Sequence, residues 1–178
     1  MKNISAPVRQ RLLNLARNDK RPFNELLQYY AMERFLYRLS TSPHCNRFIL
    51  KGALMLRVWG APQIRPTMDI DMLGETRHQE EKIMDQIKDI LNMDVEYDGL
   101  VFDPDSIQCY PIIEDADYEG VRILFRGNLN SARINMQIDM GFGDIVYPEP
   151  KSSVFPTILG YPAPRLLCYS RECHCRKI

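Results

Sequence analysis

Residues 48–73 read FILKGALMLRVWGAPQIRPTMDIDML, and this stretch sets the expected fold of the chain. Together with Arg47, its first residues form the run RFIL, which predicts a short strand, and the following ALMLRVW predicts a helix. Lys51 and Gly52 lie at the junction between the two. After a loop bracketed by prolines, MDIDML predicts a second strand. The stretch therefore predicts strand, helix and strand in close succession.

Asp69 and Asp71 place two carboxylates inside the second of these strands. Because alternate side chains of a strand share a face, the two project together from origins roughly 6.6 Å apart, and Ile70 turns into the core. Two ionised carboxylates at that separation repel by about 2.5 kcal/mol at an effective dielectric constant of ~20. A divalent cation between them reverses this sign, and rigid oxygen ligands suit Mg²⁺ or Mn²⁺. The alternative is an exposed strand with a solvated acidic face.

A third carboxylate is available in the segment NMQIDMGFGD, residues 135–144. Asn135, Gln137 and Asp139 alternate, so a strand here would direct all three side chains to one face. If this strand neighbours the MDIDML strand, three carboxylates converge. Asp144, beyond the glycine-containing turn, is the competing candidate, and a solvated acid in a turn is the other interpretation of that residue.

Lys51 and Gly52 carry a second chemical signal. Free N–H groups at the start of the following helix and the adjacent ammonium group could together bind an anion. Gly52 lets the backbone approach a ligand closely because it has no Cβ atom. An ordinary strand-to-helix turn with a surface lysine is the alternative interpretation.

The remaining patterns predict an α+β domain in which helices flank a mixed or antiparallel sheet. Two amphipathic helices are expected at the N-terminus, the first after Ser5 and the second from Pro22. Apolar spacing predicts a further helix within 77–92. The segments VRILF and RINMQIDM predict two strands, with Gly127 and the residues after it as turn residues between them. The proline-rich segment after Pro148 predicts an extended connection over the surface.

Composition predicts a single domain that works inside the cell. The chain has 178 residues, enough to bury a core, and 23 basic against 23 acidic side chains, so its net charge points to no partner. No segment is as long and apolar as a signal peptide or a membrane span requires. Five scattered cysteines do not suggest a disulfide framework, so reduced thiols in the cytoplasm are expected.

The charges are distributed unevenly along the chain. Residues 1–50 carry nine basic and three acidic side chains, whereas residues 89–119 carry ten acids and no lysine or arginine. The basic N-terminal helices could contact RNA phosphates, although the sequence shows no evident aromatic stacking platform. Solvated helix faces are the commoner cause of such a pattern.

The quoted stretch and the later FGD segment together resemble the AbiE-type (AbiEii) toxin nucleotidyltransferases, members of the DNA polymerase β-like nucleotidyltransferase superfamily. That family typically reads L-K-G-G-[ST]-A-L, then R-x-[ST]-x-D-[ILV]-D, then a third acid in a later strand that ends near F-G-D. The resemblance covers roughly residues 20–172. Seven positions of this sequence match the motifs: Lys51, Gly52, Arg65, Thr67, Asp69, Asp71 and Asp139.

The resemblance implies transfer of a nucleoside monophosphate from an NTP to an acceptor, with Mg²⁺ or Mn²⁺ as cofactor. It makes three residues both the metal ligands and the catalytic carboxylates: Asp69, Asp71 and Asp139. The nucleotide phosphates would be bound by four further residues: Lys51, Gly52, Arg65 and Thr67. In toxin members of the family the acceptor can be the 3′ end of tRNA, and a cognate antitoxin is the partner.

Two departures from the family pattern matter. Ala53 and Leu54 stand where the family has a second glycine and a Ser or Thr, so one backbone approach and one hydroxyl to the phosphates are missing. After residue 172 the chain reads CHCRKI, where the family continues into a helical domain. We expect a frameshift or a premature end, which reading the DNA beyond codon 172 in the other frames would test. The expected division is an N-terminal helical segment (1–45), a nucleotidyltransferase core (46–165) and an aberrant tail (166–178).

Loss of the helical domain would expose apolar surface and favour homo-oligomers. Two alternatives to an active RNA-modifying toxin remain: a truncated remnant that acts only as a binding module, and a small-molecule nucleotidyltransferase of the antibiotic-modifying type. A zinc site in the C-x4-C-H-C tail, from Cys168 to Cys175, is the least expected, because adjacent residues cannot readily all reach one tetrahedral ion.

Overall fold

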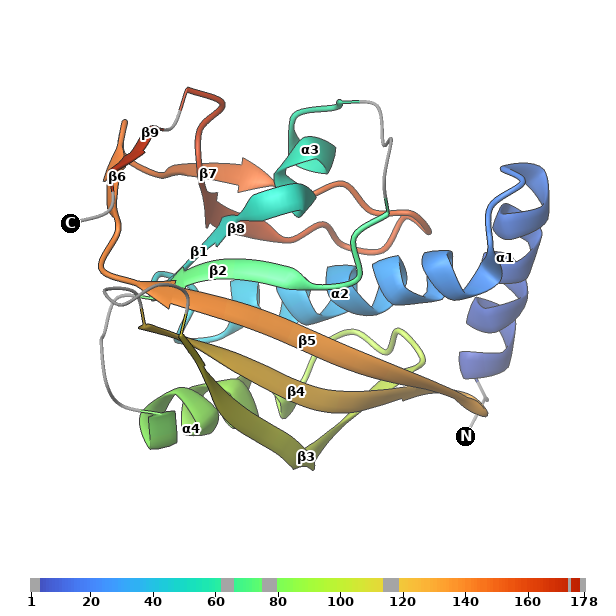
Figure 1. The fold of residues 1–178 in the computed structure, drawn as a ribbon. Helices are drawn as coiled ribbons and strands as arrows, with labels where there is room; N and C mark the ends of the chain where they lie inside the picture. Colours follow the sequence, from blue (N-terminus) through green and yellow to red (C-terminus); the bar gives the residue numbers. More distant parts are fainter. Residues whose placement is uncertain (1–3, 62–65, 75–79, 114–118, 173, 177–178) are drawn as a thin grey trace.

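A mixed sheet of seven strands forms the centre of the molecule (Figure 1). The computed structural model describes residues 4–61, 66–74, 80–113, 119–172 and 174–176. Along the sheet the strands follow the order β3-β4-β5-β2-β1-β8-β7. Their bounds are Phe48–Lys51 (β1), Ile70–Gly74 (β2), Leu100–Ile113 (β3), Glu119–Leu129 (β4), Ala132–Phe142 (β5), Lys151–Val154 (β7) and Arg165–Cys168 (β8). A separate antiparallel pair consists of β6 (Ile145–Tyr147) and β9 (His174–Arg176).

Three helices pack on the sheet, and the chain passes from β1 directly into a fourth, short helical segment (Figure 1). Helices α1 (Ser5–Asn18), α2 (Phe23–Thr41) and α4 (Glu80–Leu91) contact β4, β5 and β3 respectively. The short segment is the 3-10 turn η1 (Gly52–Leu54) followed by α3 (Met55–Val58). Within the described ranges no helix has the length and apolar character needed to cross a membrane.

Helix α2 is buried on nearly all sides because it lies between the sheet and its helical neighbours. The ring of Phe35 lies with its centroid 5.4 Å from that of Phe125 on β4 and 6.3 Å from that of Phe102 on β3. Burying one such side chain stabilises the fold by roughly 1.5–3 kcal/mol. The core therefore lies on the helical side of the sheet, and the alternating polar residues of β4 and β5 reach the opposite side.

A buried ion-pair network joins α2 to the start of β3. Arg34 Nε and Arg38 Nη1 each donate to Asp98 Oδ2 at 2.9 Å, and Arg38 Nη2 donates to Asp98 Oδ1 at 3.2 Å. The N–H of Leu100 donates to Asp98 Oδ1 at 3.0 Å. The Arg34 and Asp98 side chains are 0% and 1% exposed, so this charge is matched entirely inside the protein.

The register of the sheet brings four charged positions into one row. Asp71 on β2 lies opposite Asp139 on the parallel strand β5, and opposite Lys51 on the antiparallel strand β1. Asp139 in turn lies opposite Arg122 on β4. Residues paired across neighbouring strands share a face, so Arg122, Asp139, Asp71 and Lys51 follow one another across the sheet in that order.

The predicted α+β mixed sheet with N-terminal helices is confirmed, with four corrections to its details. The segment after Pro148, predicted as a surface connection, contributes β7 and β8 to the sheet. Gly127 and Asn128 lie within β4, and the turn comes later, where Asn130 adopts a left-handed backbone with φ 54°. Strand β3 was not predicted, because its two aspartates and two prolines hide the alternation. The predicted helix after Gly52 is split into η1 and α3.

Candidate active site

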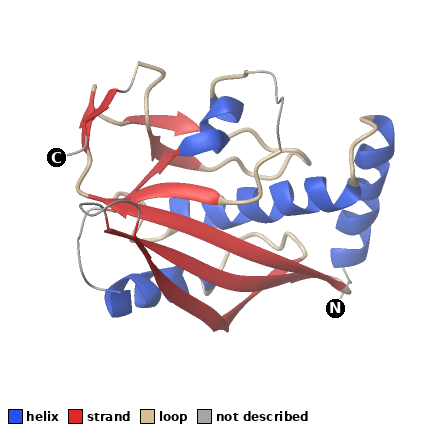
Figure 2. Ribbon diagram, in the orientation of Figure 1, coloured by secondary structure: helices blue, strands red, loops and turns tan. Residues whose placement is uncertain are grey.

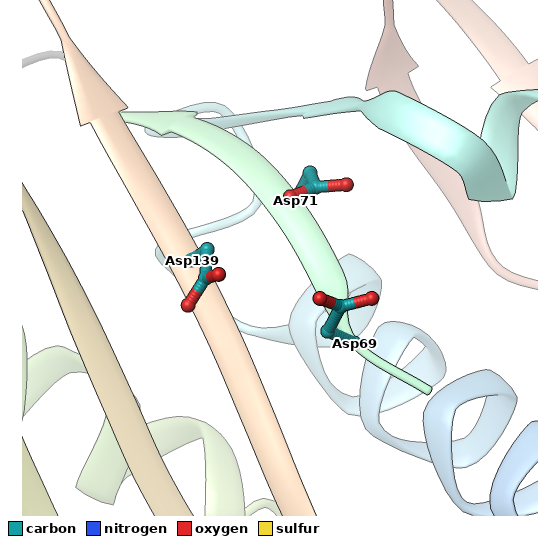
Figure 3. A group of neighbouring side chains, drawn as sticks. All are labelled: Asp69, Asp71 and Asp139. Atoms are coloured by element: carbon teal, nitrogen blue, oxygen red, sulfur yellow. The ribbon is translucent and has the colours of Figure 1, made fainter. Parts of the chain in front are cut away.

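Three carboxylates converge on the open side of the sheet (Figure 3). Asp71 and Asp139 lie opposite each other on β2 and β5, and Asp69 immediately precedes β2. One carboxylate oxygen from each lies within 4.8 Å of the others. All three residues are partly buried, which limits how well water alone can separate their charges.

The negative charge of Asp71 is compensated only in part by its neighbours. Burial raises its pKa above the usual range, and the neighbouring charges of Asp69 and Asp139 raise it further. Lys51 and the backbone N–H of Ala53, which donates to Asp71, act in the opposite direction but do not cancel the rise. A bound cation would offset the repulsion between the three carboxylates. Three convergent carboxylate oxygens are also the donor set that Mg²⁺ or Mn²⁺ prefers. The residues present therefore fit a divalent metal.

Asp139 is held on both of its oxygens by neighbours on the sheet. Arg122 donates from Nε to Oδ1 at 2.8 Å and from Nη2 to Oδ2 at 2.7 Å, which is a bidentate pair. Gln137 Nε2 adds longer bonds of 3.3 and 3.2 Å to the same oxygens. The orientation of Asp139 is thus fixed by side chains from β4 and β5. The sequence did not reveal Arg122, because only the pairing of distant strands brings it to Asp139.

Asp69 is positioned by the loop that leads into β2 and by helix α2. Thr67 Oγ1 donates to Asp69 Oδ1 at 2.8 Å, and the N–H of Thr67 donates to the hydroxyl of Tyr29 at 3.3 Å. Gln28, one residue earlier on α2, donates to the backbone carbonyl of Met68 at 3.1 Å. The structure therefore places the Thr67 hydroxyl on a carboxylate. Arg65, the other residue predicted from this loop, lies outside the described residues.

Gly52 lets the backbone pass directly against Asp71. Its φ is +71°, and a Cβ atom built there would lie 2.0 Å from Asp71 Oδ2 and 2.7 Å from Asp71 Cβ. Only glycine combines this backbone conformation with this closeness. The contact explains why Gly52 is needed, and it also explains why Asp71 is partly shielded from water.

Lys51 and Asp144 form an ion pair beside the three carboxylates. Lys51 Nζ lies 3.5 Å from Asp144 Oδ2, and the two side chains are 22% and 9% exposed. Of the two candidates for the third carboxylate, Asp139 is the one that joins Asp69 and Asp71. Asp144 instead neutralises the lysine predicted to bind phosphate.

A comparison with known protein families finds one family that matches the chain. The family described as nucleotidyl transferase AbiEii toxin, type IV TA system, matches residues 34–174, which is most of the chain. This match places the chain in a family of the nucleotidyltransferase class. The chain belongs to the AbiEii toxin family of type IV toxin–antitoxin systems, as its motifs predicted.

Two solved structures show a remote similarity to the chain. One is a crystal structure described as a candidate nucleotidyltransferase from H. pylori, with 14% sequence identity, a TM-score of 0.45, and 80% of this chain and 52% of that chain covered. The other is JHP933 from Helicobacter pylori, with 14% identity, a TM-score of 0.41, and 80% and 51% covered. The chain thus spans about half the length of these structures. No curated protein matches it.

Proposed function

We propose that this chain is a Mg²⁺-dependent nucleotidyltransferase that moves a nucleoside monophosphate from an NTP to the 3′ end of an RNA acceptor such as tRNA. In this proposal it acts as the toxin of a toxin–antitoxin pair. The observation that carries the proposal is the convergence of Asp69, Asp71 and Asp139 within 4.8 Å in a chain of the AbiEii family. Mn²⁺ would serve as the alternative cofactor.

The three carboxylates would hold the metal. A bound divalent ion would neutralise phosphate charge and lower the pKa of the acceptor hydroxyl. Thr67 keeps Asp69 in place, and Arg122 and Gln137 keep Asp139 in place, so the ligands are fixed before any substrate binds. Asp71, with its raised pKa, is the ligand that gains most from an added positive charge.

Lys51 and Gly52 would meet the triphosphate on the β1 side of the carboxylates. Lys51 follows Asp71 in the row across the sheet, and its side chain is 22% exposed. Gly52, at the start of η1, lies directly against Asp71, because a Cβ atom there would be 2.0 Å from Asp71 Oδ2. Phosphate oxygens bound at the carboxylates would therefore lie near the Gly52 backbone. Arg65 and Thr67 complete the predicted phosphate-binding set, in which Thr67 would act through Asp69.

A cognate antitoxin is the proposed partner, since the family is described as a toxin of type IV systems, and the cytoplasm is the proposed location. Self-association is a second proposal. Three apolar side chains on β6 and β7 are strongly exposed: Ile145 at 57%, Tyr147 at 75% and Val154 at 44%. Size-exclusion chromatography over a range of concentrations tests this, and a monomer at every concentration would exclude it.

The proposed activity is tested by incubating labelled NTPs with tRNA and Mg²⁺. We expect label on the RNA with the unmodified chain and none with the double variant Asp69→Asn/Asp71→Asn. Asp105→Asn is the matched control, because Asp105 is 91% exposed and pairs only loosely with Lys88 at 3.7 Å. No labelling above the double variant would rule out the activity for this chain, and label on a small-molecule acceptor would favour the antibiotic-type alternative.

A further inference from the structure

The face of β3, β4 and β5 that carries Asp139 is a polar surface continuous with the carboxylates. Figure 2 shows no described helix in front of β4 and β5 on the side turned to the viewer, and α2 passes behind β5. The register pairs Tyr110 with Arg122, Arg122 with Asp139, and Arg126 with Asn135, so these side chains share one face. We call this surface the open face and define it by six residues: Tyr110, Arg122, Arg126, Arg133, Asn135 and Gln137.

The open face differs sharply from the reverse side of the same strands. Ile123, Ile134 and Ile138 on the reverse side are at most 3% exposed and form part of the core. On the open face, by contrast, Tyr110 is 47% exposed, the Arg122 and Arg126 side chains are 43% and 57% exposed, and Arg133 and Asn135 are exposed. Large solvent-accessible guanidinium and amide groups thus follow β4 and β5 away from Asp139, and the phenol of Tyr110 lies on β3 opposite Arg122.

The row of charges across the sheet indicates from which side the acceptor would approach the carboxylates. Two cations flank the carboxylates, with Lys51 on the β1 side and Arg122 on the β4 side. In an in-line displacement at phosphorus, the attacking and leaving oxygens lie on opposite sides. If the leaving pyrophosphate lies toward Lys51, the acceptor hydroxyl must approach from the side of Arg122. That side is the open face.

The chemistry of the open face suits a nucleic-acid strand better than an apolar protein segment. Guanidinium groups bind phosphates through paired N–H donors, and an exposed aromatic ring stacks on bases. Arg133 makes no ion pair with any described residue. Within the part of the chain that the structure describes, the Arg126 guanidinium forms an ion pair only with Asp103, at 3.3 Å on the surface. An exposed pair of this kind contributes little stability and is easily replaced by a ligand. From Asp139 to Arg133 the strand spans about 20 Å, enough for a few extended nucleotides.

We propose that the open face binds the terminal nucleotides of a single-stranded RNA acceptor, with its last hydroxyl directed to Asp139, its phosphates on Arg126 and Arg133, and one base stacked on Tyr110. Arg122 lies at the junction between this surface and the carboxylates. The proposal rests on the proposed nucleotidyl transfer and adds to it the route of the acceptor. It also differs from the expectation that the basic N-terminal helices contact RNA.

Binding of a short fluorescein-labelled single-stranded RNA, measured by fluorescence anisotropy at several salt concentrations, tests this route. We expect Tyr110→Ala to weaken binding at least about fivefold, and Tyr110→Phe to leave it nearly unchanged because the ring is kept. We expect Arg126→Ala and Arg133→Ala to weaken binding and each to reduce the slope of log K against log salt by about 0.7. Arg165→Ala, at an exposed position on β8, is the matched control and should leave binding unchanged.

The outcomes distinguish the proposed RNA route over the open face from the proposed nucleotidyl transfer itself. Mn²⁺-dependent thermal stabilisation should be equal in the open-face variants and the unmodified chain, which shows that the carboxylates are intact. Unchanged RNA binding in Tyr110→Ala and Arg133→Ala would overturn the route, even if metal binding and nucleotidyl transfer are observed. Arg17 lies in the last turn of α1. A loss of RNA binding confined to Arg17→Ala would overturn the route in favour of the N-terminal helices. If the open-face variants lose antitoxin binding while RNA binding is unchanged, the surface is a protein interface and the route is likewise overturned.

Discussion

Asp98 and Asp71 are both shielded aspartates, but Asp98 is surrounded by cationic side chains and Asp71 by further carboxylates. Asp98 is 1% exposed and receives hydrogen bonds from Arg34, Arg38 and the N–H of Leu100. Asp71 is partly buried beside two further carboxylates, and Lys51 is its main cationic neighbour. Cations of the chain therefore balance the negative charge of Asp98 but balance that of Asp71 only in part.

This difference shows how a structural acid can be told from a functional one. A carboxylate saturated by buried guanidinium groups has no capacity for a ligand and serves to hold elements together. A cluster of carboxylates with too few neighbouring cations destabilises the fold through repulsion, and a bound cation relieves that repulsion. The Asp98 network therefore joins α2 to β3, whereas the Asp71 cluster is suited to a metal.

The largest effect is expected from breaking the Asp98 network. Arg38→Met removes two hydrogen bonds to Asp98 and leaves a buried charge incompletely paired, so the free energy of unfolding should fall by about 3–5 kcal/mol. Denaturant unfolding measures this. The matched control is Arg126→Met, which breaks the exposed pair with Asp103 and should cost less than about 1 kcal/mol. Equal losses in the two variants would contradict the structural role of Asp98.

Glu33, next to this network, should give the largest pH effect on stability. Its Oε2 accepts the N–H of Ile158 at 2.8 Å, whereas Oε1 has no hydrogen-bond partner among the described residues. Burial raises the pKa of Glu33 from 4.5 to about 7. A raised carboxyl pKa contributes stability that is present below pH 4.5 and is lost as the pH rises through about 7.

Glu33→Gln keeps the acceptor for Ile158 and removes this titration. Relative to the variant, the unmodified chain should therefore lose roughly 3 kcal/mol of stability between pH 4.5 and pH 8. Denaturant unfolding of both proteins across this range is the measurement. A stability difference that does not change with pH would show that Glu33 is not held in the protonated form.

Gly52 tests the close approach of the backbone to Asp71. Gly52→Ala combines a left-handed backbone with a Cβ atom 2.0 Å from Asp71 Oδ2, and we expect a loss of about 2–3 kcal/mol and weaker metal binding. Gly60→Ala is the matched control, because Gly60 has φ +65° and nothing within 4 Å of the added Cβ. It should lose only about 1 kcal/mol. Thermal unfolding with and without Mn²⁺ would show an equal response in both variants if the contact with Asp71 were unimportant.

Local patterns in the sequence predicted much of the fold and part of the site. The alternation around Asp71 and Asp139 correctly indicated strands, and the adjacency of β2 and β5 then brought the carboxylates together. The prediction that Asp69 lies inside the strand was wrong, because β2 begins only at Ile70. Arg122 could not be found in this way, because its pairing with Asp139 depends on the register between β4 and β5. Such a register is set by packing of the whole sheet.

The errors have similar physical causes. Strands β7 and β8 lie in a proline-rich segment whose local propensity favours a loop. Pairing of β8 with β1, and of β7 with β8, nevertheless places both strands at the edge of the sheet. Asp98 lies in an acidic stretch that gave no sign of burial, because its partners Arg34 and Arg38 are 60 or more residues away in the chain. Long-range charge pairing is invisible to a local pattern.

The most direct test of the metal site compares the unmodified chain with Asp71→Asn in thermal unfolding, first with EDTA and then with Mn²⁺ or Mg²⁺. Without metal, Asp71→Asn should be the more stable by a degree or a few, because it removes one of three mutually repelling charges. With metal at about ten times its Kd, the unmodified chain should gain about 1.4 kcal/mol and become the more stable. A metal response in Asp71→Asn as large as that of the unmodified chain would contradict a cation held by Asp69, Asp71 and Asp139.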